Sequence, residues 1–162
     1  LSLGGCALTP ELFDVLRIES GHAVMPHEIN EKRNPLELRE AARAVSFTKG
    51  CYIGQEVIAR LDAQGKVQRE LVGLQLLAGS ALAAGDRLVD PTLDAASPLG
   101  NEVGELTSIA RSPRFGLIAL GFVRKKYAAA GTLLEAQRQA VGGADTASSP
   151  VTVQHLPFST TA

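Results

Sequence analysis

The stretch VQRELVGLQLL, residues 67–77, decides the fold because it begins a series of short segments rich in valine and leucine. The segments that follow are separated by Gly, Pro, Asp and Ser. They are GDRLVD (85–90), NEVGELTSIARS (101–112), GLIALGFVRKKY (116–127), GTLLEAQ (131–137) and VTVQHLPF (151–158). Short strands at such intervals are typical of a small antiparallel barrel or sandwich. We therefore expect one such unit over residues 65–162.

The chain before this series has helical signals instead. TPELFDVLRIESG, residues 9–21, places Thr9 as an N-cap, Pro10 in the first turn and Gly21 just past the end. These positions predict a short helix. We expect its buried face to consist of Leu12, Phe13 and Leu16.

Residues 22–66 are more broken and polar. We expect a long loop with one helical turn after Asn34, a short strand over Val45–Phe47, a tight turn at Cys51 and a helix from about Gly54 to Leu61. The change in texture near residue 65 predicts two domains, residues 1–64 and residues 65–162, joined by a hinge-like loop.

Composition excludes several classes of protein. The chain has 162 residues, a formal net charge of -1 and 45% hydrophobic residues, so no global basic field draws it to nucleic acid. It contains no apolar run of membrane-spanning length and no charged-then-apolar leader. Its two cysteines lie far apart in sequence, which favours a reducing, cytoplasmic setting. The chain opens on Leu1 rather than Met, so we expect a piece of a longer protein.

Cys51 lies where the chain turns from the expected strand into the expected helix. A thiol is a weak nucleophile unless its thiolate form is stabilised. Lys49 brings a positive charge within two residues, and the start of the next helix presents free N–H groups. The joint could therefore form a reactive thiol or an anion-binding corner. From local pattern alone, the favoured interpretation is that Cys51 is a small buried residue beside glycines that turn the chain.

A wider pattern surrounds that cysteine. KGCYIGQE, residues 49–56, resembles the signature K-G-C-[FY]-x-G-Q-E of the folate-binding YgfZ family, relatives of the glycine cleavage T-protein (aminomethyltransferase). Four further stretches resemble this family in the same order, namely LRIESG (16–21), HEINEKRNPLE (27–37), GKVQRELVGL (65–74) and HLPF (155–158). The resemblance implies an α+β fragment, the end of the folate-binding T-protein-like domain followed by a small antiparallel C-terminal β-barrel.

The resemblance also implies site residues. Cys51 would be the distinguishing reactive group with Lys49 beside it, and Gly50 and Tyr52 would border the folate hole. Glu19 would hydrogen-bond the pterin ring of tetrahydrofolate, as a carboxylate can accept two N–H bonds from its edge. An alternative is that Glu19 is a surface carboxylate paired with Arg17 or Lys32.

The anionic tail of folate requires a cation. Arg69, and more weakly Lys66, match positions where T-proteins carry basic residues near that tail, and a guanidinium suits a carboxylate. The alternative for Arg69 is a solvated strand residue. His22 and His27 lie near Glu28, but their spacing fits no known ligand set, and we expect no metal site.

Three functions follow from these residues. The first is a tetrahydrofolate-binding YgfZ-like protein that assists the synthesis or repair of iron–sulfur enzymes. The second is an aminomethyltransferase of the T-protein kind, a folate-dependent one-carbon transferase. The third is a non-catalytic β-barrel module that docks a partner. The expected partners are folate, iron–sulfur proteins and the missing N-terminal domain of the same chain, and neither nucleic acid nor a membrane. Whether the protein is an enzyme is left open by the sequence.

Overall fold

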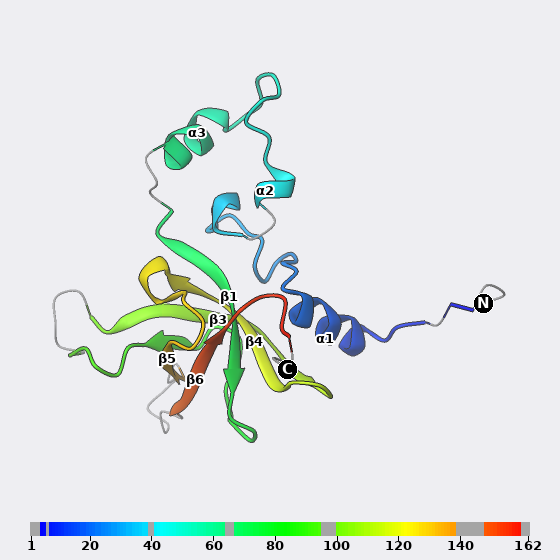
Figure 1. Cartoon of the computed structure of the whole chain (residues 1–162), viewed down its shortest axis with the longest axis vertical. Helices are drawn as coiled ribbons and strands as arrows, with labels where there is room; N and C mark the ends of the chain where they lie inside the picture. Colours follow the sequence, from blue (N-terminus) through cyan, green and yellow to red (C-terminus); the bar gives the residue numbers. More distant parts are fainter. Residues whose placement is uncertain are drawn as a thin grey trace.

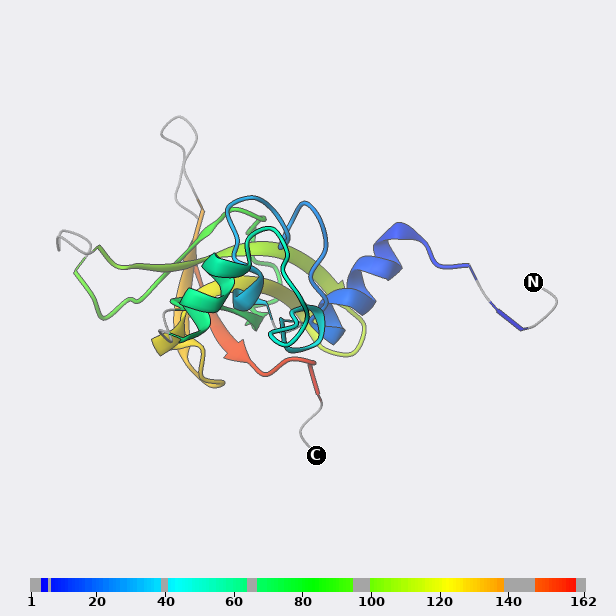
Figure 2. The ribbon, with the colours of Figure 1, turned by 90° about the horizontal axis from the view of Figure 1, so that it is seen from above.

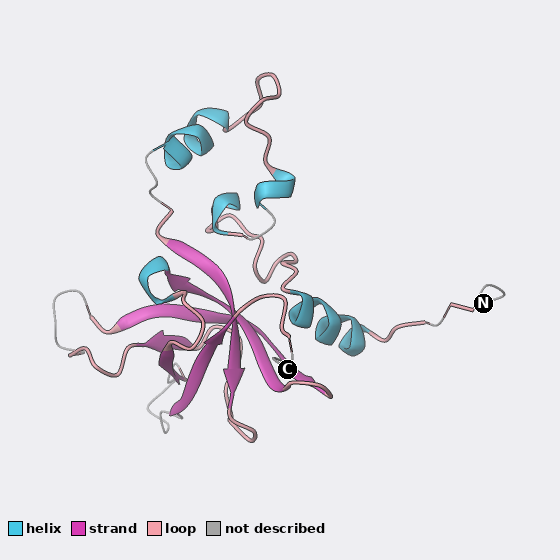
Figure 3. Cartoon of the chain, in the orientation of Figure 1, coloured by secondary structure: helices cyan, strands magenta, loops and turns pink. Residues whose placement is uncertain are grey.

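The structure is a computed structural model that describes residues 4–5, 7–38, 41–63, 67–94, 100–138 and 148–159, apart from the side chains of residues 42 and 43. Helical elements come first along the chain and strands follow (Figure 3). The helical elements are α1 (Pro10–Ser20), the 3₁₀ helix η1 (Pro35–Glu37), α2 (Ala41–Ala44), α3 (Gln55–Ala63) and the later 3₁₀ helix η2 (Lys125–Tyr127). The strands are β1 (Arg69–Leu76), β2 (Arg87–Val89), β3 (Glu102–Ser112), β4 (Gly116–Arg124), β5 (Leu133–Gln137) and β6 (Ser148–Gln154).

The strands form a closed barrel in the order β1-β4-β3-β2-β5-β6, and every pair is antiparallel (Figure 1). The predicted fold is therefore confirmed, and of barrel and sandwich the barrel is correct. Closure leaves β1 bonded to β4 on one side and to β6 on the other. Each strand is therefore bonded to a neighbour on both of its sides.

The barrel interior is one apolar cluster to which all six strands contribute. Its members are Val72, Leu74, Leu76, Leu88, Val103, Leu106, Ala119, Val123, Leu134, Ala136, Val151 and Val153. Close packing of the strands requires a residue without a side chain at Gly104, where a Cβ atom would collide with the backbone oxygen of Phe122. The interior is thus filled by side chains and is a core rather than a channel.

The outer face of β4 is apolar as well. Ile118, Leu120 and Phe122 alternate with the inward-facing residues and join a second cluster that includes Ile18 of α1 and Leu156 after β6. This arrangement explains why GLIALGFV reads as a continuous apolar run, since the barrel covers one face and α1 with its neighbours covers the other. Figure 2 shows the end of α1 seated against the barrel while its beginning projects away.

Helix α1 has the predicted ends but not the predicted buried face. Thr9 accepts a hydrogen bond from the Leu12 amide, and Gly21 ends the helix with φ +75°. Leu12, Phe13 and Leu16 are exposed, whereas the buried residues are Arg17, Ile18 and Glu19. The expected stripe is wrong because only the last turn of α1 meets the barrel.

The segment between α1 and the barrel matches the prediction in part. Asn34 caps η1 by accepting from the Leu36 amide at 2.8 Å, which is the helical turn expected there. Helix α3 lies where a helix was expected. No strand forms over Val45–Phe47, because the Val45 amide instead bonds to Ala41 and continues the turn of α2. A boundary near residue 65 stays a prediction.

Candidate functional site

The signature loop, residues 49–52, lies between α2 and α3 and stands away from the barrel (Figure 1). Cys51 is a free, exposed thiol, so the alternative of a buried structural cysteine is not what the structure has. Gly50 has open space around it. The loop therefore presents its thiol to any ligand or protein that approaches this side of the molecule.

Lys49 and Tyr52 lie on either side of Cys51 in the sequence and contact each other. The Lys49 ammonium lies 4.8 Å from the centroid of the Tyr52 ring, a cation–π contact. The Gln55 amide bonds to the Tyr52 carbonyl at 3.2 Å, so the first turn of α3 fixes Tyr52. The three predicted residues Lys49, Cys51 and Tyr52 thus form one small unit with a cation, a thiol and a half-buried ring.

Helix α3, which follows the loop, has no buried residue. Ile53 and Val57 are exposed apolar side chains on this segment, and Phe47 before the loop is half exposed. Helix and loop are therefore held by few contacts from the barrel, unlike the last turn of α1.

Glu19 lies at the other end of the helical segment, in the last turn of α1. It is 8% exposed, and its Oε1 accepts a hydrogen bond from Ser112 Oγ at 2.6 Å. Ser112 in turn accepts from the amides of Arg114 and Phe115, each at 2.9 Å. Glu19 therefore holds the turn between β3 and β4, and it is neither exposed nor paired with Arg17 or Lys32.

A buried charge network escaped the sequence analysis. Glu28 is fully buried, and its Oε1 accepts from Thr107 Oγ1 at 2.7 Å and from Ser108 Oγ at 2.6 Å. Its Oε2 accepts from Arg17 Nη1 and from the Val24 amide, both at 3.2 Å. A bulge in β3 makes this possible. The pairing with β4 skips Thr107, so two consecutive hydroxyls reach the same carboxylate.

A sequence signal for this network did exist. Arg17 lies between two apolar residues in LRIESG, and Glu28 lies in HEINEKRNPLE, both of which carry the family resemblance. Arg17 also donates to Asp14 Oδ1 at 2.6 Å and to Ser108 Oγ at 2.8 Å. Every one of these hydrogen bonds either lies within residues 14–28 or joins them to β3. The network therefore fixes α1 and the loop after it against the barrel.

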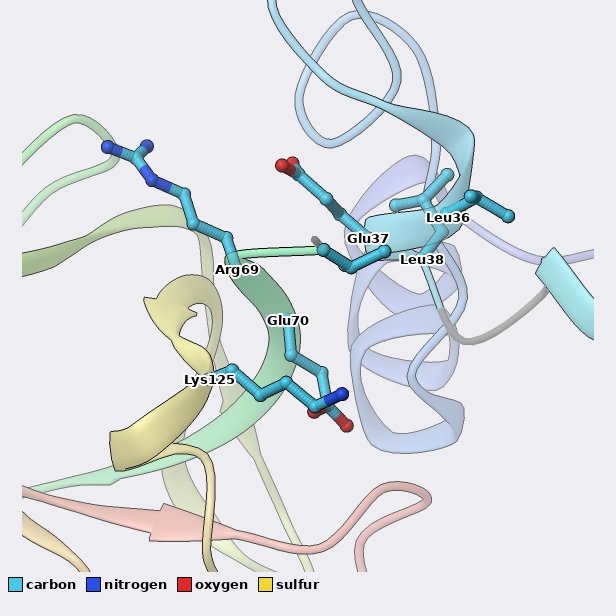
Figure 4. Close-up of a pocket in the computed structure, with 7 residues that line it drawn as sticks. Leu36, Glu37, Leu38, Arg69, Glu70 and Lys125 are labelled. Carbon is cyan, nitrogen blue, oxygen red and sulfur yellow. The ribbon is translucent and has the colours of Figure 1, made fainter. Parts of the chain in front are cut away.

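Arg69 lines a cleft of about 180 Å³ between η1 and the start of β1 (Figure 4). We call it the Glu37 cleft. Its lining residues are Leu36, Glu37, Leu38, Val67, Arg69, Glu70 and Lys125. Within the described part of the chain, the Arg69 guanidinium forms no ion pair, and Lys66 lies outside the described residues. A cation without a fixed counterion thus lies at a hollow of the surface.

Glu37 has an unusual environment in this cleft. Its Oε2 is buried without a hydrogen-bond partner. Burial raises the pKa of Glu37, while the charges of Arg33 and Arg69 and a hydrogen bond from the Asn34 backbone oppose that rise. Burial also lowers the pKa of Arg33, whose guanidinium pairs with Glu105 and lies 4.2 Å from the centroid of the Phe122 ring. Sequence analysis missed Glu37, since nothing local indicates that its carboxylate turns inward.

The predicted site residues therefore lie in three places. Lys49, Gly50, Cys51 and Tyr52 share the signature loop, Glu19 lies against the β3–β4 turn and Arg69 lies at the Glu37 cleft. Among the described residues, no hydrogen bond or ion pair joins these places. The described residues also contain no cluster of three metal-ligating side chains, and none of their helices is long and apolar enough to cross a membrane.

Comparison with known proteins adds the following. Residues 69–158 match the family model of the glycine cleavage T-protein C-terminal barrel domain. The chain is similar to an aminomethyltransferase of Nostoc sp., with 33% identity over 125 residues, 76% of this chain and 31% of that protein. It is also similar to a mitochondrial iron–sulfur cluster assembly factor IBA57 homologue of Aspergillus fumigatus, with 43% identity over 72 residues, 43% of this chain and 16% of that protein.

A solved structure has the same fold. The glycine cleavage system aminomethyltransferase T of Bartonella henselae superposes with a TM-score of 0.64 at 21% identity, covering 90% of this chain and 37% of that one. The present chain thus spans about a third or less of the curated relatives to which it is similar.

Proposed function

The chain belongs to the family of glycine cleavage T-protein C-terminal barrel domains, and from that membership we propose that it is part of a tetrahydrofolate-binding, YgfZ-like protein that assists the synthesis or repair of iron–sulfur enzymes. The observation that carries the proposal is the exposed Cys51 in a loop with the family signature, with Lys49 and Tyr52 in contact beside it. The similarity to an iron–sulfur cluster assembly factor supports the same role.

The residues present fit parts of a folate. Tetrahydrofolate supplies a carrier for one-carbon units when it is bound. The Tyr52 ring offers a flat surface for an aromatic group, although Lys49 already lies over one side of it. Arg69 offers a guanidinium without an ion pair for a carboxylate of the tail. Glu19 would offer an acceptor to the pterin edge through its second carboxylate oxygen, because Ser112 already donates to Oε1.

The role of Cys51 rests on its accessibility. A thiol that solvent reaches can approach a protein-bound cluster or a disulfide, whereas a buried thiol first requires the structure to open. Lys49 keeps a positive charge in the loop, which favours an approaching anion over a cation. The third function considered, a non-catalytic barrel that only docks a partner, would be favoured if Cys51 were buried and inert. Cys51 is exposed, so this condition is not met.

The experiment has two arms. In cells that lack the endogenous protein, the longer protein that contains this chain should restore the activity of iron–sulfur enzymes. The Cys51→Ala variant should lose at least about tenfold of that activity, as expected for the loss of a reacting group. Thr48→Ala is the matched control, because it is exposed on the same loop, and it should keep full activity. Equal activity of both variants would remove the reason for assigning this function to Cys51.

The second arm is a fluorescence titration with tetrahydrofolate. Arg69→Gln should weaken binding by about tenfold if Arg69 holds the tail, since a charge-assisted hydrogen bond is lost. Glu11→Gln, an exposed carboxylate at the start of α1 that does not line the cleft, should bind as the parent does. A protein that shows no binding of tetrahydrofolate would contradict the proposal.

An aminomethyltransferase is the second candidate, and the similarity to the Nostoc enzyme over 76% of this chain favours it. The two candidates differ in what Cys51 does. Transfer of a methylene group to tetrahydrofolate by this protein, unaffected by Cys51→Ala, would favour the transferase over the iron–sulfur role.

A further inference from the structure

The Glu37 cleft contains unmatched polar groups of opposite kinds. On the η1 side, the buried Oε2 of Glu37 is an acceptor without a donor. Across the cleft, the Arg69 guanidinium is a donor without an ion pair among the described residues. A buried acceptor left without a hydrogen bond is costly, so such a group indicates a partner that the chain itself does not provide.

The arrangement of charged side chains around the cleft restricts which chemical groups could bind in it. In Figure 4 the ends of Glu70 and Lys125 point to the same end of the cleft, whereas Glu37 and Arg69 lie at the other end. Three formal charges of each sign surround the site when Arg33 and its partner Glu105 are included. A simple cation would meet Arg69 and a simple anion would meet Glu37. A group that has a donor and a carboxylate close together can bond to both Glu37 and Arg69.

The size of the cleft and its walls agree with a small group of this kind. A volume of about 180 Å³ accommodates a few heavy atoms. Leu36, Leu38 and Val67 supply apolar walls that exclude water from hydrogen bonds made inside.

We propose that the Glu37 cleft binds an α-amino-acid group, with Glu37 accepting from its ammonium or amide N–H and Arg69 donating to its carboxylate. The same chemistry is present in a free amino acid and in the glutamate end of a folate. The proposal stands on the cleft alone and does not require the function proposed above.

The main competing explanation is that Arg69 turns inward and pairs with Glu37 itself. In that case the cleft would have no unmatched group, and no small molecule would bind. Charge-removing variants of either residue would then only change stability. Binding experiments separate the two explanations.

The probe is L-alanine, titrated into the 162-residue chain and followed by isothermal calorimetry and by NMR shifts of residues at the cleft. Three control compounds test each contact: propionate lacks the amine, ethylamine lacks the carboxylate, and the N-trimethylated derivative of alanine keeps both charges but has no N–H. We expect saturable binding of L-alanine and affinity at least about tenfold weaker for each control compound, the loss expected for one charge-assisted hydrogen bond.

The protein variants test the two residues. Glu37→Gln and Arg69→Gln should each weaken the binding of L-alanine at least about tenfold. Glu11→Gln removes an exposed carboxylate at the start of α1, which does not line the cleft, and should change the affinity by less than about twofold. Thermal unfolding of each variant verifies that it is folded. Equal binding of alanine and its trimethylated derivative would overturn the role of Glu37, and absence of binding to the folded parent would overturn the site.

A final arm identifies the source of the group. Displacement of L-alanine by tetrahydrofolate, with loss of both in Arg69→Gln, would assign the cleft to the glutamate end of a folate. Saturable alanine binding that tetrahydrofolate does not disturb would assign it to a free amino acid. Tetrahydrofolate binding without any binding of alanine would refute this site and leave the proposed function intact.

Discussion

The barrel and the Cys51 segment, residues 41–63, are held in different ways. Each strand of the barrel contributes to one buried cluster, and the neighbouring strands bond to each other all around. In the Cys51 segment, by contrast, helix α3 has no buried residue, and Ile53 and Val57 are exposed. The exposed Cys51 thiol therefore lies in a segment that packs little against the rest of the described chain, whereas the barrel is tightly packed.

This difference has a physical meaning. Free energies of local opening are small where few apolar contacts are made and approach the global value in a core. A loop with few contacts can adjust to a partner at low cost, whereas a barrel strand cannot. We expect the following four experiments to break or sharpen the comparison, and they run from the largest effect to the smallest.

Thiol labelling should show the largest contrast. In a Cys6→Ser background, Cys51 should react with iodoacetamide as readily in the native protein as in urea, because it is exposed. A cysteine placed in the core by Ala119→Cys, with Cys51→Ser, should react at least about 1,000-fold more slowly under native conditions, because it needs global opening. Similar native rates at the two positions would show that the barrel is not the rigid region.

Charge removal should show the next contrast. Glu28→Ala removes the buried partner of Arg17 and leaves it only the half-exposed Asp14 as a counterion, so the free energy of unfolding should fall by about 3–5 kcal/mol in urea denaturation. Glu56→Ala removes an exposed pair with Arg60 in α3, and the loss should be about 0.5 kcal/mol or less. Equal losses would mean that the Arg17–Glu28 pair is not buried in solution.

Adding one methyl group should distinguish the regions again. Gly104→Ala forces a Cβ atom against the Phe122 backbone, and we expect a loss of about 2–3 kcal/mol of unfolding free energy. Gly50→Ala in the signature loop meets no atom within 4 Å, and a change of less than about 0.5 kcal/mol is expected. The contrast is contradicted if Gly104→Ala unfolds at the same urea concentration as the parent.

The smallest effect concerns pH, at the border between the two regions. Burial raises the pKa of Glu37 above its unfolded value, against the opposing charges of Arg33 and Arg69. Glu70 and Lys125 line the same cleft, and their charged groups lie at the end of it away from Glu37. The folded state therefore binds the Glu37 proton more tightly than the unfolded state does. Stability from this group is present at low pH and is lost as the pH rises through the folded pKa.

The Glu37→Gln variant tests the sign. Its unfolding free energy relative to the parent should rise as the pH rises from the ordinary range of a glutamate through the raised pKa of Glu37, since the variant has no proton to lose there. Urea denaturation at several pH values measures this difference. A relative stability that falls with rising pH would show that the arginines outweigh burial at Glu37.

The barrel could be predicted because its signals are local and repeated. Segments such as GLIALGFV and VTVQ indicate strands through valine and leucine between turn residues, and the number of such segments indicates a small barrel or sandwich. The ends of α1 were equally accessible, since Thr9 and Gly21 act on their own helix. The family signature at Cys51 indicated the region that proved to be exposed.

What the sequence did not disclose depends on distant partners. Periodicity gave α1 an apolar stripe at Leu12 and Leu16, but which face is buried depends on the place where the barrel meets the helix. The Glu28 network needs hydroxyls about 80 positions later in the chain, and Glu37 depends on the fold of η1 against β1. Neighbouring residues in the sequence do not identify these distant partners, because each contact is set by tertiary packing.

The bulge in β3 has a consequence for assembly of the molecule. In a regular strand, Thr107 and Ser108 would point to opposite sides, and one of the two hydroxyls would miss Glu28. A shift of β3 against β4 by a single residue would therefore remove a hydrogen-bond donor from the Glu28 carboxylate in the loop after α1. The segment after α1 therefore stabilises one register of the β3–β4 hairpin, because Glu28 keeps both hydroxyl donors only in that register.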